Sequence, residues 1–247
     1  MEEKSQQPAN EVLQDVRRTL QRYEERESPE KPLAFPSELR NRILKSCDLN
    51  HLVENTMKQW EVAVLYRKQL QKANVTLDPD TAHPKLILSE DGKSLRLGDK
   101  PQALPDNPER FRRYSCVLGR ERFTAGGHFW EVNVGSGEEW ALGVARKSVE
   151  RKGIIYLIPE WGIWAVGKWG GKYWACTSPV SSPLSLFWEP RSIWVTLDYE
   201  GGRVSFSDAD SGAELYTFSG ASFSGETLLP FFHLWGNEAH LSISCGD

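Results

Sequence analysis

The sequence lacks the residue patterns on which many catalytic and metal-dependent functions rest. Its four cysteines stand far apart, at Cys47, Cys116, Cys176 and Cys245, with no C-x-x-C pair and no histidine at zinc-ligand spacing. No H-E-x-x-H, G-x-S-x-G or phosphate-binding G-x-x-x-x-G-K-[ST] motif occurs. We therefore expect reduced thiols, no metal or other cofactor, and no enzymatic activity.

Long apolar runs and an excess of positive charge are also missing. No apolar run approaches the roughly 20 residues that cross a bilayer, and the N-terminal MEEKSQQPANEV is polar and acidic, unlike a secretion signal. The net charge of -4 does not favour attraction of the whole chain to nucleic acid or to an anionic membrane. We expect a cytoplasmic protein that binds neither.

Local charge clusters have ordinary explanations. Two basic clusters, ERFRRYS at residues 109–115 and RKSVERKG at residues 146–153, suggest nucleic-acid contacts, but glutamates interrupt both, and solvated loop charges are the favoured interpretation. A paired-carboxylate hydrolase is a weaker alternative to edge solvation and turn capping for the acidic side chains of the strand region, Glu131, Glu139, Asp198 and Glu200.

Up to about residue 72 the apolar residues recur at helical spacing, in two stripes separated by the proline-rich ESPEKPLAFPSELR. Each helix has one apolar stripe and a polar back, so each must pack on something else. A helical layer on the following domain and the end of a coiled coil with a second copy both satisfy this requirement. The stripes are Val12, Val16, Leu20 and Tyr23, and then Leu49, Val53, Met57, Trp60 and Val64.

From about Asp78 onward, apolar residues recur at every second position. Short runs rich in β-branched and aromatic residues alternate with Gly, Pro, Asp and Ser turns, which predicts an antiparallel β-sandwich or barrel. In HFWEVNV, Trp130, Val132 and Val134 share the face expected to be buried. In DYEGGRVSF, Gly201 and Gly202 are expected to supply the positive φ of a two-residue hairpin turn.

The residues that alternate with each tryptophan along its strand divide the tryptophans into core residues and candidate interface residues. Trp130, Trp140, Trp164 and Trp194 share parity with Val132, Leu142, Val166 and Thr196 and are assigned to the core. The segment EWGIWAVGKWGGKYWACTSP, residues 160–179, raises the question of whether its other indoles plug the ends of the core or form an interface. Trp161 and Trp169 are placed at strand ends, Trp174 on a face open to solvent or a pocket, and Trp235 in a loop.

The strand region resembles the PRY-SPRY domain of tripartite-motif proteins and butyrophilins. LDPDTAHPKLILSEDGKSLR from Leu77, LPDNPERF followed by CVLGRERFTAGGHFWEVNVG from Leu104, and VTLDYEGGRVSF from Val195 carry the resemblance, in the family's order and spacing. It implies a mainly β fold, a bent antiparallel, concanavalin-like sandwich, over residues 74–247. Residues 1–73 resemble the helical coiled-coil end and linker of tripartite-motif proteins, which implies a homodimer, although butyrophilin tails also place helix before this domain.

The resemblance implies a protein-recognition module that captures a target protein or peptide, as the substrate-recognition part of a RING-type ubiquitin ligase. Without RING or B-box zinc ligands, the chain is expected to have no ligase activity alone and to be a fragment or truncated paralogue. The alternative is a small-ligand sensor of the butyrophilin type. The positions matching that group's basic side chains hold Tyr114, Trp174, Val180 and His233.

The family uses loops and a shallow cleft at one end of the sandwich for partners. Matching positions and the tryptophan analysis give one set of candidate partner-binding residues: Arg113, Tyr114, Tyr156, Trp161, Trp169, Trp174, Trp235, Gly236 and Asn237.

Overall fold

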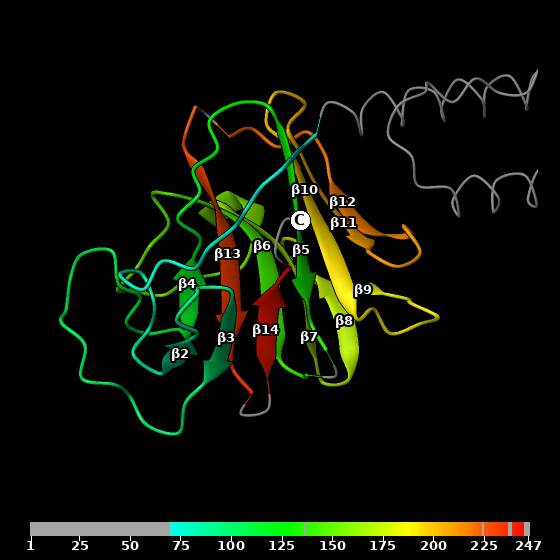
Figure 1. Ribbon diagram of the computed structural model, residues 1–247. Coiled ribbons are helices and arrows are strands. Elements are labelled where there is room, and N and C mark those ends of the chain that lie inside the picture. Colours follow the sequence, from blue (N-terminus) through cyan, green and yellow to red (C-terminus); the bar gives the residue numbers. More distant parts are fainter. Residues whose placement is uncertain (1–69, 136, 224, 237–238, 245–247) are drawn as a thin grey trace, which may run out of the picture. The chain divides into compact units, whose positions relative to one another are not determined.

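The computed structural model describes residues 70–135, 137–223, 225–236 and 239–244 of the 247-residue chain. Both helical stripes expected in residues 1–73 lie outside the described residues. At the end of that segment the chain forms a short strand, β1 (Gln71–Lys72), which pairs in parallel with β5. The predicted mainly β fold is confirmed, with two sheets packed as a sandwich (Figure 1).

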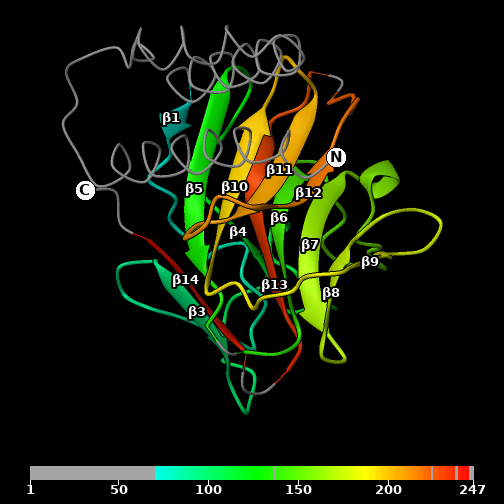
Figure 2. The ribbon, with the colours of Figure 1, turned by 90° about the vertical axis from the view of Figure 1, so that its right-hand side faces the viewer.

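The first sheet has eight strands in the order β12-β11-β10-β5-β14-β3-β2, with β1 beside β5 (Figure 2). All pairs except β1–β5 are antiparallel. The strands other than β1 are β2 (Leu86–Leu88), β3 (Ser94–Leu97), β5 (Gly127–Asn133), β10 (Ser192–Asp198), β11 (Arg203–Asp208), β12 (Glu214–Phe218) and β14 (His240–Ile243).

The second sheet has six antiparallel strands in the order β4-β13-β6-β7-β8-β9. A short 3-10 helix, Pro159–Trp161, leads into β7. The strands are β4 (Cys116–Leu118), β6 (Trp140–Arg146), β7 (Ile163–Trp169), β8 (Lys172–Ala175), β9 (Ser182–Leu184) and β13 (Leu228–Leu234).

Alternating residues of the two sheets meet in the main core. Val132 of β5, Val195 of β10 and Leu142 of β6 are fully buried there, together with Trp130 and Trp140. The prediction that Trp130, Val132 and Val134 face inward is therefore confirmed.

One core assignment is wrong. Trp194 is only half-buried, because Ile193, Val195 and Leu197 fill the inward positions of β10 and leave Trp194 on the outer face of the sheet. There its indole N–H donates to Glu131 Oε2 at 3.1 Å and its ring contacts Phe129. In SIWVTLD, the alternating aliphatic residues, rather than the aromatic residue, show which face of the strand is buried.

The expected turn at Gly201–Gly202 also differs. Asp198 pairs with Arg203, so four residues connect β10 to β11, and of the two glycines only Gly202 has a positive φ. The tight two-residue turn lies instead at Gly170–Gly171, between Trp169 and Lys172, and both glycines have positive φ. This turn requires two left-handed residues in succession, which glycine adopts without strain.

The outer face of the six-stranded sheet carries a second, smaller apolar cluster. Cys116, Ala165 and Phe231 lie on its strands, and the covering segments add Phe111 and Ile155. The sheet is thus buried on both faces over part of its area. The uncovered part of this outer face contains the candidate site.

Candidate partner-binding groove

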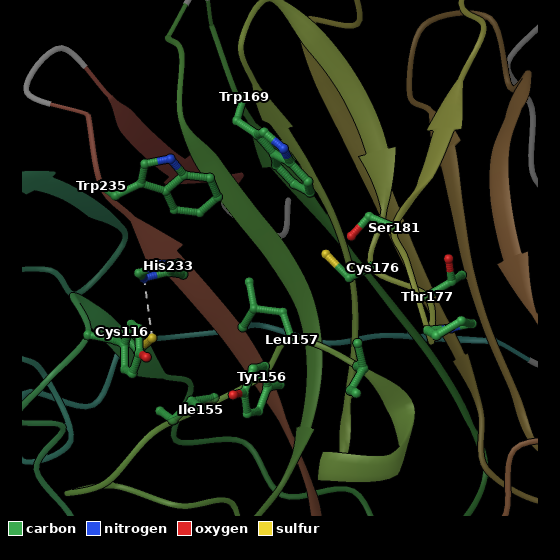
Figure 3. A pocket seen from close by; sticks show the side chains of 13 residues that line it. Cys116, Ile155, Tyr156, Leu157, Trp169, Cys176, Thr177, Ser181, His233 and Trp235 are labelled. Carbon is green, nitrogen blue, oxygen red and sulfur yellow. Dashed lines mark hydrogen bonds between the residues drawn. The ribbon is translucent and has the colours of Figure 1, made fainter.

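A groove of about 410 Å³ opens over the outer face of the six-stranded sheet (Figure 3). Its walls come from segments far apart in the sequence: the residues before β4, the loop before the 3-10 helix, the end of β7, the segment after β8 and the end of β13. We call this cavity the aromatic groove. The lining residues are Tyr114, Cys116, Ile155, Tyr156, Leu157, Ile158, Trp169, Cys176, Thr177, Pro179, Ser181, His233 and Trp235.

Aromatic rings form a continuous series along the groove. Trp174 stacks on Trp169 at 5.4 Å between ring centroids, and Trp169 contacts Trp235 at 5.8 Å. Trp235 in turn packs against His233 at 4.6 Å, and Tyr114 makes a T-shaped contact with His233 at 6.2 Å. The indole N–H of Trp174 donates to the main-chain carbonyl of Trp169 at 3.2 Å, which fixes one end of the series.

Small residues on the central strands give the rings their room. A Cβ on Gly167 of β7 would lie 2.9 Å from Cζ3 of Trp169 and 2.5 Å from the main-chain oxygen of Trp140. Gly167 also pairs with Ala141 of β6, so no large side chain projects from the sheet at these two positions beneath the rings. The Trp169 ring consequently lies back across its own strand rather than projecting into solvent.

His233 joins the aromatic series to a buried thiol. Its Nδ1 lies 3.3 Å from Cys116 Sγ and 3.2 Å from the main-chain oxygen of Ser115. Burial lowers the pKa of His233 to about 4, although the hydrogen bond to Ser115 opposes this shift. The imidazole is therefore neutral at physiological pH.

Neither cysteine of the groove has the character of a nucleophile. Burial raises the pKa of Cys176 to about 12 and raises that of Cys116 still further, so both stay protonated near neutral pH. These thiols serve as small apolar surface in the wall of the groove.

The structure brings most of the predicted partner-binding residues together. Tyr156, 53% exposed, and Trp161, 45% exposed, form an edge-on pair at 5.0 Å beside the groove. Arg113 is exposed and does not line the groove, and Gly236 follows Trp235 directly. Asn237 lies outside the described residues. Four predicted residues line the groove, Tyr114, Tyr156, Trp169 and Trp235, and Trp174 supports it from behind Trp169.

The sequence interpretation missed the apolar wall opposite the indoles. Ile155, Leu157 and Ile158 belong to the run GIIYLIP, which has the composition of a strand but forms a covering loop. Thr177, Pro179 and Ser181 come from the turn segment after β8. An apolar run bounded by Gly153 and Pro159 was a usable signal, since a loop with this composition must cover apolar surface or line a cavity.

The basic clusters beside the groove differ from the solvated charges expected. Arg110 is buried, and its guanidinium donates to the main-chain oxygens of Pro79, Ala82 and Pro105 at 2.7 to 2.9 Å. Arg151 is buried over the ring of Phe111 at 4.7 Å.

Asp106 binds two further members of the basic clusters, Arg112 at 3.2 Å and Lys152 at 2.8 Å. Much of the positive charge thus holds the segments before β4 and after β6 together.

The profile of the SPRY-associated domain, PRY, matches residues 75–123, and that of the SPRY domain matches residues 127–246. The chain carries a PRY-SPRY domain. Its homologues are butyrophilin and tripartite-motif proteins, so the family resemblance noted from the motifs is confirmed. Membership of this family is consistent with a protein-interaction module.

Two relatives illustrate the similarity. Butyrophilin subfamily 1 member A1 of Bos taurus is 53% identical over 68% of this chain and 32% of its own length. Zinc finger protein RFP of Homo sapiens is 42% identical over 95% of this chain and 47% of its own length. The chain thus spans between about a third and a half of the length of these relatives.

Solved structures agree on the fold. The TRIM65 PSpry domain superposes with a TM-score of 0.63 at 22% identity, covering 75% of this chain and 96% of that one. A stonustoxin structure gives a TM-score of 0.62 at 23% identity over 70% of this chain and 29% of that one. In the part of the PRY-SPRY chain that the structure describes, no helix is long and apolar enough to cross a membrane.

Proposed function

We propose that this PRY-SPRY domain binds a target protein or peptide in the aromatic groove. The observation that carries the proposal is the unbroken series of rings from Trp174 to Tyr114, which borders an open cavity instead of being closed over by the fold. Large aromatic side chains at the centre of an interface contribute most of its binding energy. Trp161, which is exposed and paired with Tyr156 of the groove wall, extends the same surface beyond the cavity.

The wider setting follows from the relatives. We propose that the domain acts as the substrate-recognition part of a RING-type ubiquitin ligase in the cytoplasm, and that residues 1–73 supply a dimerising helical segment. Tripartite-motif relatives that align with 95–99% of this chain support both statements. The ligase activity itself would belong to a RING domain that this sequence does not contain.

A peptide array derived from a proteome and probed with the full chain tests target binding. Replacing Trp169, Trp174 or Trp235 by alanine should weaken binding of a captured peptide by about 2 kcal/mol or more, as at other interface hot spots. Phe187→Ala is the matched control, since Phe187 is 97% exposed and does not line the groove. Equal binding by all four variants would contradict the proposal.

A small-ligand sensor is the second candidate, because a volume of about 410 Å³ lies in the range of small-molecule sites. Its lining contains no Lys, Arg, Asp or Glu, so a phosphorylated metabolite would lack a counter-charge there. A soluble ligand that raises the melting temperature of the chain would favour this candidate, and a peptide that competes with it would show that the two share the groove.

A further inference from the structure

One polar atom in the wall of the aromatic groove has no partner. His233 is 8% exposed, and both of its hydrogen-bond contacts are made by Nδ1. Among the described residues, no hydrogen bond reaches its other ring nitrogen, Nε2. Nε2 is not one of the buried unpaired polar atoms of the described residues, so it is open to the groove, where water or a ligand can satisfy it.

The contacts of Nδ1 determine which nitrogen holds the proton. The main-chain oxygen of Ser115 can only accept a hydrogen bond, so an Nδ1 atom bonded to it must donate. The alternative, in which the Cys116 thiol donates to Nδ1, replaces an N–H donor by a weak S–H donor and leaves the Ser115 contact unmade. The ring is neutral, so a proton on Nδ1 leaves Nε2 with a free lone pair.

The surroundings restrict what can use that lone pair. Trp235 packs against the imidazole with the two rings tilted by 37°, Tyr114 makes a T-shaped contact with it, and Figure 3 shows His233 beside Trp235 in the wall of the groove, so a bound group reaches Nε2 from within the groove. The groove is lined by aromatic, aliphatic, thiol and hydroxyl groups, without a formal charge. A carboxylate has no proton for Nε2 near neutral pH, and a carboxylate or phosphate bound here would be desolvated without a cationic partner.

We propose that His233 is a specificity-determining residue of the aromatic groove, which accepts a hydrogen bond at Nε2 from a flat, uncharged N–H or O–H donor of the target. The donor lies against the ring of Trp235, and anionic groups are rejected. This inference rests on the proposed function, in that the same groove binds the target, and it adds the chemistry that the target must present.

The first test reads the proton position directly on the unaltered chain. Long-range ¹H–¹⁵N spectra of the full chain near neutral pH should show His233 as the Nδ1–H tautomer. An Nε2–H tautomer or a charged imidazole would overturn the proposal. Because no substitution is needed, this test does not depend on how any variant folds.

The second test uses two probes that differ by one hydrogen-bond donor, indole and 1-methylindole, titrated while the His233 resonances are followed. Since one hydrogen bond is lost, 1-methylindole should bind roughly threefold to tenfold more weakly. Inorganic phosphate should leave the His233 resonances unchanged. Equal affinities, no response to indole at its solubility limit, or a saturable response to phosphate would each refute the proposal.

Two variants complete the design. His233→Phe keeps a ring but removes the acceptor, and it should make the two indoles bind equally. The Ser115 carbonyl keeps its hydrogen bond from the Leu234 N–H at 3.1 Å in this variant. Phe187→Ala should retain the wild-type ratio, since Phe187 lies outside the groove. A ratio that persists in His233→Phe would show that another residue selects the donor.

Failure of this inference is distinguishable from failure of the proposed function. If Trp169→Ala abolishes peptide capture while both indoles bind the wild-type chain equally, the groove binds targets and His233 does not select them. If the indoles are discriminated but peptide capture is unaffected by Trp169→Ala, the targets bind elsewhere.

Discussion

Mild acidification should destabilise this PRY-SPRY domain through His233. The pKa of His233 is about 4 in the folded chain and about 6.5 when the chain is unfolded. Between these values the unfolded state binds more protons, so stability is fully present above the unfolded pKa and is lost as the pH falls toward the folded one. The free energy of unfolding should drop by about 2 kcal/mol from about pH 7 to about pH 5.

Urea unfolding at a series of pH values, followed by tryptophan fluorescence, measures this loss. His233→Phe is the control, because a phenyl ring takes up no proton, and only the difference in pH dependence between the two proteins is compared. Groups that do not interact with His233 cancel in that difference, whereas His83 has a coulombic interaction with His233. Burial also lowers the pKa of His83, and hydrogen bonding to Lys152 lowers that of Asp106.

The refuting result is a His233→Phe variant that loses stability with falling pH as steeply as the wild type. It would mean that His233 takes up its proton without cost in the folded state. The imidazole would then be open to water rather than buried between Tyr114 and Trp235, and the description of the groove would be wrong at this residue.

Three further predictions concern the rest of the chain. Trp130→Ala should lower the free energy of unfolding by about 3 to 5 kcal/mol in urea titrations, because Trp130 is fully buried between the sheets; a loss under about 1 kcal/mol would contradict this. Arg110→Ala should cost about 3 kcal/mol by the same assay, because three main-chain carbonyls, one of them buried, lose a charged donor, and Arg110→Lys should recover only part of it. Light scattering should give about twice the monomer mass for the full chain and a monomer for residues 74–247; a monomeric full chain at high micromolar concentration would refute dimerisation through the N-terminal segment.

The sequence predicts the fold wherever one face of a strand is plainly apolar. Trp130, Trp140 and Trp164 lie in the core as expected from their neighbours. The same rule fails for Trp194, because an aromatic ring is large enough to lie on an outer face and still be half-covered. The whole set of alternating residues decides which side chains of a strand face the core. In β10, Ile193 and Val195 together outweigh a single indole.

The groove was predictable only in part, for a geometric reason. Trp169 and Trp174 are close in sequence, and the Gly170–Gly171 turn brings them together, so local pattern sufficed. Trp235 and His233 reach the same place through the pairing of β13 with β6. The order of the strands in the sheet decides which distant segments meet, and the spacing of residues along the chain does not reveal that order.

Strand β7 has core positions along its length and a groove position at its end. Its inward residues Trp164 and Val166 belong to the main core, its outward residues Ile163 and Ala165 belong to the smaller apolar cluster, and Trp169 at its end lines the groove. At its end Lys168 is buried and paired with Glu138 at 3.1 Å, which anchors the strand independently of Trp169. Under the proposed function, Trp169 is therefore the position of β7 that can change with the target, while the other positions of the strand keep the sandwich and its covering segments folded.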